Sequence, residues 1–124
     1  MSGKSTPNPV ERCQSMLRRD LRLAIKARRA DEARTLRCLL AAIDNAQAVP
    51  VGDLHEKYVV RPFADGSAEA PRIELSEADL ERLLPGEAQD RIGAARQCEQ
   101  VGRMDRANSL RAEADIVRRY FGNP

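Results

Sequence analysis

The sequence predicts a small, mainly α-helical bundle made of two antiparallel helical hairpins, with an irregular or two-stranded β insert between them. Apolar residues recur every three or four positions along four stretches of the chain, which is the period of an amphipathic helix. Aromatic residues make up only 3% of the sequence, so Leu, Ile, Val and Ala must build the core. The 124 residues suffice for one core. We expect a disordered N-terminus over residues 1–8 and a single domain over 9–124.

The first hairpin is predicted over residues 9–48. Asn8 is a good N-cap, Pro9 suits the first helical position, and Glu11 stands where a capping-box carboxylate belongs. We expect this helix to run to about residue 29 and the next, capped by Asp31, to run to about residue 48. Their predicted apolar faces comprise Cys13, Leu17, Leu21, Ala24 and Ile25, and then Leu36, Leu39, Leu40, Ile43 and Ala46. The short connection between them favours an antiparallel pair.

The helical period is lost in the insert, residues 49–75. Several Pro and Gly residues interrupt it, and the runs "YVVRPF" (58–63) and "RIEL" (72–75) could pair as two short strands. An irregular loop is the alternative. The chain's one histidine, His55, lies in this stretch, where an exposed loop position is the simplest interpretation.

The second hairpin is predicted over residues 76–121. Ser76 and Asp79 form a second capping box, and Pro85, which has no amide hydrogen, predicts that a new helix begins there. That helix should end at Gly102, which suits a left-handed C-cap. A short corner and a last helix, capped by Asp105, should follow. The predicted apolar positions are Leu80, Leu83 and Leu84, and then Ala107, Leu110, Ala114, Val117 and Phe121.

Charge is unevenly distributed along the chain. The net charge is only +2, but residues 1–49 hold ten of the 21 basic residues and five of the 19 acidic ones. Six cations are candidate contacts for successive RNA phosphates: Arg18, Arg22, Lys26, Arg29, Arg34 and Arg37. Because aromatic stacking residues are scarce, such binding would read the backbone and not the bases. Two alternatives remain open, a solvated helix face and a basic half that docks onto an acidic surface.

The sequence offers little for catalysis or for metal binding. It contains no G-x-S-x-G and no glycine-rich phosphate loop, and its carboxylates do not cluster in ligand patterns. Cys13, Cys38 and Cys98 are far apart, so we expect small helical filler residues and neither a disulfide nor a zinc site. No run of 18 apolar residues occurs. We therefore expect no catalytic residue, cofactor, metal or membrane partner, and a soluble, cytoplasmic protein.

Two groups of residues carry a resemblance to a known family. The second hairpin contains L-x-x-E-x-x-x-R and E-x-x-G-R-x-D-x-A, and the first contains L-x-x-D-L-x-x-A-x-K-A followed by "RTLRCLLAAIDN". The matching polar and glycine positions are Asp20, Lys26, Arg37, Asn45, Glu87, Arg91, Glu99, Gly102, Arg103 and Asp105. In these positions the chain resembles the GatB/YqeY family.

The resemblance implies a helical domain related to part of the B subunit of glutamine-dependent aminoacyl-tRNA amidotransferases. There the related region helps to engage tRNA, while the chemistry lies elsewhere, so tRNA or a tRNA-handling enzyme is the implied partner. We expect the chain to lack the family's usual C-terminal tail domain. We expect a noncatalytic accessory module. The alternative is a protein–protein adaptor or self-associating bundle, so a homo-oligomer stays open. A carbon–nitrogen ligase that uses glutamine as amido donor is the least favoured reading.

Overall fold

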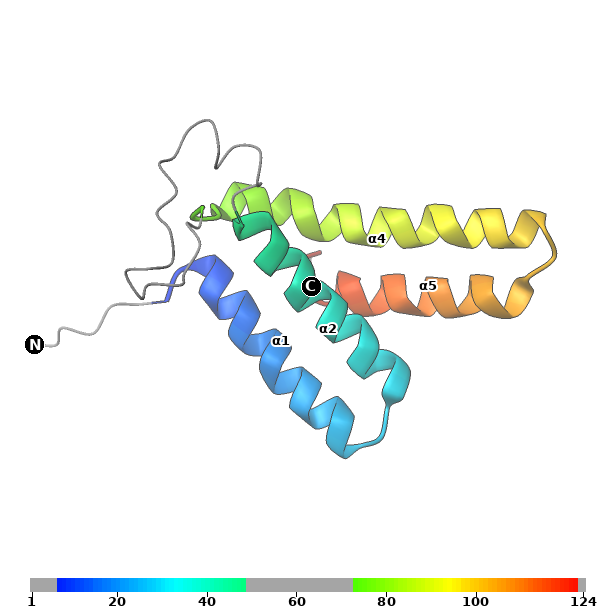
Figure 1. Ribbon diagram of the computed structural model, residues 1–124, viewed down its shortest axis with the longest axis horizontal. Coiled ribbons are helices and arrows are strands. Elements are labelled where there is room, and N and C mark those ends of the chain that lie inside the picture. Colours follow the sequence, from blue (N-terminus) through cyan, green and yellow to red (C-terminus); the bar gives the residue numbers. More distant parts are fainter. Residues whose placement is uncertain (1–6, 49–72, 123–124) are drawn as a thin grey trace, which may run out of the picture.

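Four helices form two antiparallel hairpins in the computed structural model, which describes residues 7–48 and 73–122 (Figure 1). The first hairpin pairs α1 (Pro9–Lys26) with α2 (Ala30–Gln47), and the second pairs α4 (Glu77–Gln100) with α5 (Met104–Arg118). The predicted mainly helical bundle of two hairpins is therefore confirmed. The predicted strand at 58–63 lies outside the described residues, as do His55 and most of the insert. The other predicted strand, at 72–75, does not form over its described residues 73–75, which have no regular secondary structure.

Both predicted capping boxes are present. The Asn8 side chain accepts the Glu11 amide at 2.8 Å, and the Glu11 carboxylate accepts the Asn8 amide at 3.1 Å. At the start of α4, the Ser76 hydroxyl accepts the Asp79 amide at 3.0 Å and the Asp79 carboxylate accepts the Ser76 amide at 3.1 Å. These reciprocal bonds satisfy amides that have no partner inside the helix, which fixes where each helix begins.

The hairpin corners differ from the sequence prediction. α1 ends at Lys26 instead of residue 29, because the next amides fold back onto the last carbonyls of the helix. Asp31 and Asp105 do not cap α2 and α5. Each is the second residue of its helix, where its negative charge still interacts favourably with the positive end of the helix dipole.

The prediction that a new helix begins at Pro85 was wrong. α4 continues through this proline for 24 residues. An interior proline loses one backbone hydrogen bond and costs about 3 kcal/mol. Leu80 and Leu84 before it and Ala88 after it are all buried on the same side of α4. Burial of this continuous face outweighs the local cost, so tertiary packing overrides the helix-breaking signal.

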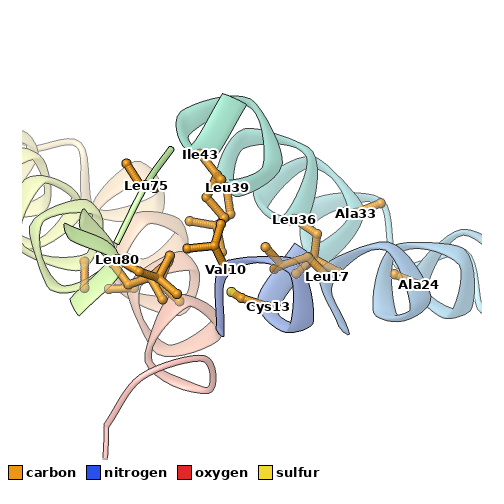
Figure 2. Packing of buried hydrophobic residues seen from close by; sticks show 14 residues of the cluster. Val10, Cys13, Leu17, Ala24, Ala33, Leu36, Leu39, Ile43, Leu75 and Leu80 are labelled. Atoms are coloured by element: carbon orange, nitrogen blue, oxygen red, sulfur yellow. The ribbon is translucent and has the colours of Figure 1, made fainter. Parts of the chain in front are cut away.

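The main core lies where the two hairpins meet. Figure 2 shows Val10, Leu39 and Ile43 of the first hairpin beside Leu80 of α4 and beside Leu75, which precedes that helix. The largest fully buried side chains come from both hairpins and are Leu17, Leu36, Leu39, Ile43, Leu84, Val117 and Thr35. The hydroxyl of Thr35 is satisfied by the Asp31 carbonyl at 3.0 Å. The two hairpins therefore share one apolar core.

Two details of the predicted core were wrong. Ile25 is 51% exposed, because it lies at the end of α1 and away from the line of buried residues. Of the three cysteines only Cys13 is buried, while Cys38 is exposed and Cys98 is partly buried. Burial raises the pKa of the Cys13 thiol, which keeps it neutral and suits a filler role.

The second hairpin extends beyond the first (Figure 1). Ala95, Ala107 and Leu110 form a separate small cluster that joins α4 to α5. Small side chains allow the two helices to approach closely at this end. The insert begins and ends at one place, since the Ile73 amide donates to the Gln47 carbonyl at 2.6 Å. None of the described helices is long and apolar enough to cross a membrane.

Candidate functional site

The six predicted RNA-binding cations all lie on the first hairpin, and all are exposed. Two of them are held by carboxylates. Arg34 pairs with Asp31 at 2.8 Å, and Arg29 lies 3.6 Å from a Glu32 oxygen. The other four have no ion pair within residues 7–48 and 73–122, and we call these four the basic face: Arg18, Arg22, Lys26 and Arg37.

The basic face has two shallow concave areas. In one, Arg18 of α1 lies opposite Ala41 and Asp44 of α2 across the groove between the helices. In the other, Arg22 and Lys26 border a patch near the end of α1 together with the side chains of Arg19, Leu23 and Ile25. Leu23 is 57% exposed, so this second area combines cations with accessible aliphatic surface.

Most carboxylates of the first hairpin are engaged elsewhere. Glu11 belongs to its capping box, and Asp31 holds Arg34. Asp20 accepts the Tyr120 hydroxyl at 2.5 Å, and Glu32 accepts a guanidinium N–H of Arg119 at 2.8 Å. Asp44 lies beside Arg18 in the groove, so one carboxylate borders the basic face. The excess positive charge of the first hairpin nevertheless lies at its surface.

The bonds of Asp20 and Glu32 join the first hairpin to the end of α5. Burial raises the pKa of Tyr120, and the hydrogen bond to Asp20 raises it further. Burial opposes ionisation of Asp20, but the hydrogen bonds from Tyr120 and Arg19 outweigh that effect and lower its pKa. Arg119 also lies over the Tyr120 ring, 5.9 Å from its centre. We call Asp20, Glu32, Arg119 and Tyr120 the clasp. The clasp fixes the orientation of α1 and α2 on the second hairpin.

The family-like residues of α4 are structural partners inside the second hairpin. Arg91 donates to Glu87 at 2.9 Å and to Glu113 of α5 at 3.2 Å. Although desolvation lowers the pKa of Arg91, its pairs with the two carboxylates raise it overall, so the guanidinium remains charged. Glu99 accepts a hydrogen bond from Arg111 across the same pair of helices. These residues hold α4 to α5.

The remaining family-like residues are scattered over the surface. Gly102, Arg103 and Asp105 form the exposed corner before α5 and the first turn of that helix. Asn45 is exposed near the end of α2, where its carbonyl accepts the Ala48 amide at 3.2 Å. Lys26 and Arg37 belong to the basic face, and Asp20 belongs to the clasp. The structure thus does not gather the family-like positions into one site.

Some structurally important residues escaped the sequence prediction. Glu113 is buried and pairs with Arg91, and Arg106 lies 3.7 Å from its other oxygen. A signal was available, since Glu113 has helical spacing from Leu110 and Val117 and therefore lies on the apolar face of α5. Asp115, two residues further along α5, is exposed and pairs with Arg118 at 2.9 Å, so the two carboxylates point to different sides of the helix.

Comparison with known proteins adds no identification: no family model, no curated protein and no solved structure matches this chain. The resemblance to the GatB/YqeY family therefore stays a prediction. Within the described residues, no group of three or more His, Cys, Asp or Glu side chains could hold a metal ion. The basic face is the candidate site that the geometry presents.

Proposed function

We propose that the protein is a noncatalytic accessory module that binds the backbone of RNA, with tRNA as the preferred class, through the basic face of its first hairpin. The observation that carries this proposal is the set of four exposed cations on α1 and α2 that no carboxylate of the described chain pairs with. Exposed guanidinium groups suit phosphates, because their planar fork can donate two parallel hydrogen bonds.

The arrangement favours backbone contact over base reading. Arg18, Arg22 and Lys26 are spaced four residues apart along α1, so they form a row about 12 Å long. A row of that length can contact two or three successive phosphates. Arg37 adds a cation from the neighbouring helix. The aromatic residues of the described chain, Tyr120 and Phe121, follow the end of α5 and pack against the core, so they offer no stacking platform beside this row.

The test is a salt titration with unfractionated tRNA. Fluorescence anisotropy of a labelled tRNA would be followed between about 50 and 200 mM salt, where log affinity should fall with a slope of about −0.9 for each phosphate contacted. The triple variant Arg18→Ala/Arg22→Ala/Lys26→Ala should reduce that slope by about 3 while keeping the helical circular dichroism spectrum.

A matched control removes the same charge from the other hairpin. Arg82, Arg96 and Arg118 are exposed on α4 and α5, and their replacement by Ala should change the slope much less. Equal losses in both triple variants would mean that only overall charge matters and would overturn the basic face as the site. Absence of wild-type binding at low salt would overturn the RNA proposal as a whole.

A second candidate function rests on a separate observation. Leu23 and Ile25 are more than half exposed between Arg19, Arg22 and Lys26. Aliphatic surface bordered by cations fits an acidic, amphipathic helix of a protein partner better than it fits phosphates alone. The adaptor reading predicts that Leu23→Ser/Ile25→Ser abolishes partner binding and leaves tRNA affinity unchanged. Sedimentation over a range of protein concentrations tests the related possibility of self-association.

A further inference from the structure

The two hairpins turn their corners in the same way. After α1, the Arg28 amide donates to the Ile25 carbonyl at 3.1 Å and the Arg29 amide to the Ala24 carbonyl at 2.9 Å. After α4, the Gly102 amide donates to the Glu99 carbonyl at 3.0 Å, and the next amide donates to the Cys98 carbonyl at 2.8 Å. Both pairs of bonds are the Schellman motif, which places one left-handed residue just after the helix.

The left-handed residue differs between the corners. Gly102 has φ +80° and Arg28 has φ +60°. Glycine adopts this conformation freely, whereas a residue with a Cβ atom is strained there. Space does not dictate the choice, since a Cβ added at Gly102 would meet nothing within 4 Å. In equivalent backbone geometry, the first hairpin therefore has a strained arginine where the second has an unstrained glycine.

The fold does not compensate Arg28 for this strain. Its side chain is exposed, and no residue of the described segments accepts a hydrogen bond from it or forms an ion pair with it. The carbonyl end of α1 does attract a cation, but Lys26 in the last turn already occupies that position. The adjacent Arg29, in contrast, is paired with Glu32.

We propose that Arg28 is a further phosphate-contacting residue, at the tip of the first hairpin, where it extends the row of cations on α1. This inference rests on the RNA-binding function proposed above and adds to it a residue outside the six predicted cations. Residues held in strained conformations concentrate at functional sites, where binding compensates for the strain. Arg28 lies two residues after Lys26, at the end of the helix that carries this row of cations.

The decisive experiment measures stability and tRNA binding in the same variants. Arg28→Gly should raise the thermal midpoint, because it relieves the strain, and should weaken tRNA binding about tenfold near 50 mM salt, as expected for one lost phosphate contact. Arg28→Ala keeps the strained backbone and should show the weaker binding without the gain in stability. Arg28→Lys keeps the charge and should retain most of the affinity.

Two controls separate the possible causes. Arg96→Ala removes one exposed charge from α4 and should leave binding near the wild-type value. Gly102→Arg installs the strained residue in the second corner and should lower the thermal midpoint. Wild-type affinity in Arg28→Gly, with salt-dependent binding intact, would overturn the role of Arg28 and leave the basic face standing. No binding by the wild type would overturn the proposed function itself. A lower midpoint in Arg28→Gly would overturn the strain argument.

Discussion

Replacement of Arg91 by Met should lower the free energy of unfolding more than replacement of any exposed charged residue. The side chains of Arg91 and Glu113 are only 12% and 11% exposed, so their ion pair is almost removed from water. An exposed pair contributes at most about 1 kcal/mol, but removing one partner of a buried pair costs about 3–5 kcal/mol because the other charge is left buried. With these exposed fractions, Arg91 and Glu113 form a buried pair.

The expected magnitude lies at the lower end of that range. After Arg91→Met, Glu113 keeps only Arg106, which is 3.7 Å away and half-exposed, and Glu87 can turn toward water. We expect a loss of about 3 kcal/mol in the free energy of unfolding, or roughly 12 °C in thermal midpoint for a chain of this size. Urea denaturation followed by circular dichroism at 222 nm measures this loss directly.

A double variant identifies the cause. Arg91→Met/Glu113→Met removes both charges and fills similar volume, so it should lose no more than about 1–2 kcal/mol, less than Arg91→Met alone. The single and double variants together give the coupling between the two residues. A loss below about 1 kcal/mol in Arg91→Met would show that the pair behaves as a surface pair and would refute the reasoning from burial.

Three further outcomes follow from the fold. Pro85→Ala should raise the free energy of unfolding by about 1–3 kcal/mol in urea titrations, since the new amide can donate to the Glu81 carbonyl; a loss of stability would contradict the account of α4. Leu36→Ala should cost about 2–5 kcal/mol, measured in the same way, because this side chain is fully buried. Tyr120→Phe should cost about 1–2 kcal/mol at neutral pH, since it removes a hydrogen bond to a charged acceptor. The folded pKa of Asp20 is lowered, so this contribution is present above the ordinary carboxyl pKa and is lost as the pH falls through the folded value. A Tyr120→Phe deficit that persists unchanged into acid would exclude Asp20 as its source.

The arrangement of the fold could be predicted from local signals where these agree with tertiary packing. The capping boxes at Asn8 and Ser76 and the left-handed Gly102 appear as the sequence predicts, because cap chemistry acts over three or four residues. Pro85 was misread because its effect depends on what packs around it. The burial of Leu84 and Ala88, which keeps the helix continuous, cannot be predicted from the proline.

The candidate site was predictable only in part, for a related reason. Exposure of the six cations follows from their position off the apolar stripe of each helix. Which of the six are paired depends on local geometry. The partner of Arg29, Glu32, also accepts a hydrogen bond from Arg119, which is 87 residues away in the sequence. The left-handed conformation of Arg28 could not be predicted, because arginine rarely adopts it. Glycine adopts it freely, so a glycine after a helix predicts it.

The distribution of ion pairs gives the two hairpins different physical roles. In the described chain, the second hairpin places the Arg91–Glu113 pair in its interior and has Gly102 at its corner, which are choices that favour stability. The first hairpin keeps its pairs at the surface and accepts Arg28 in a strained conformation. A glycine at residue 28 would adopt the left-handed conformation without strain, whereas Arg28 does not. Selection for stability alone does not account for an arginine at this corner, and the phosphate-binding role proposed above does, because binding would compensate for the strain.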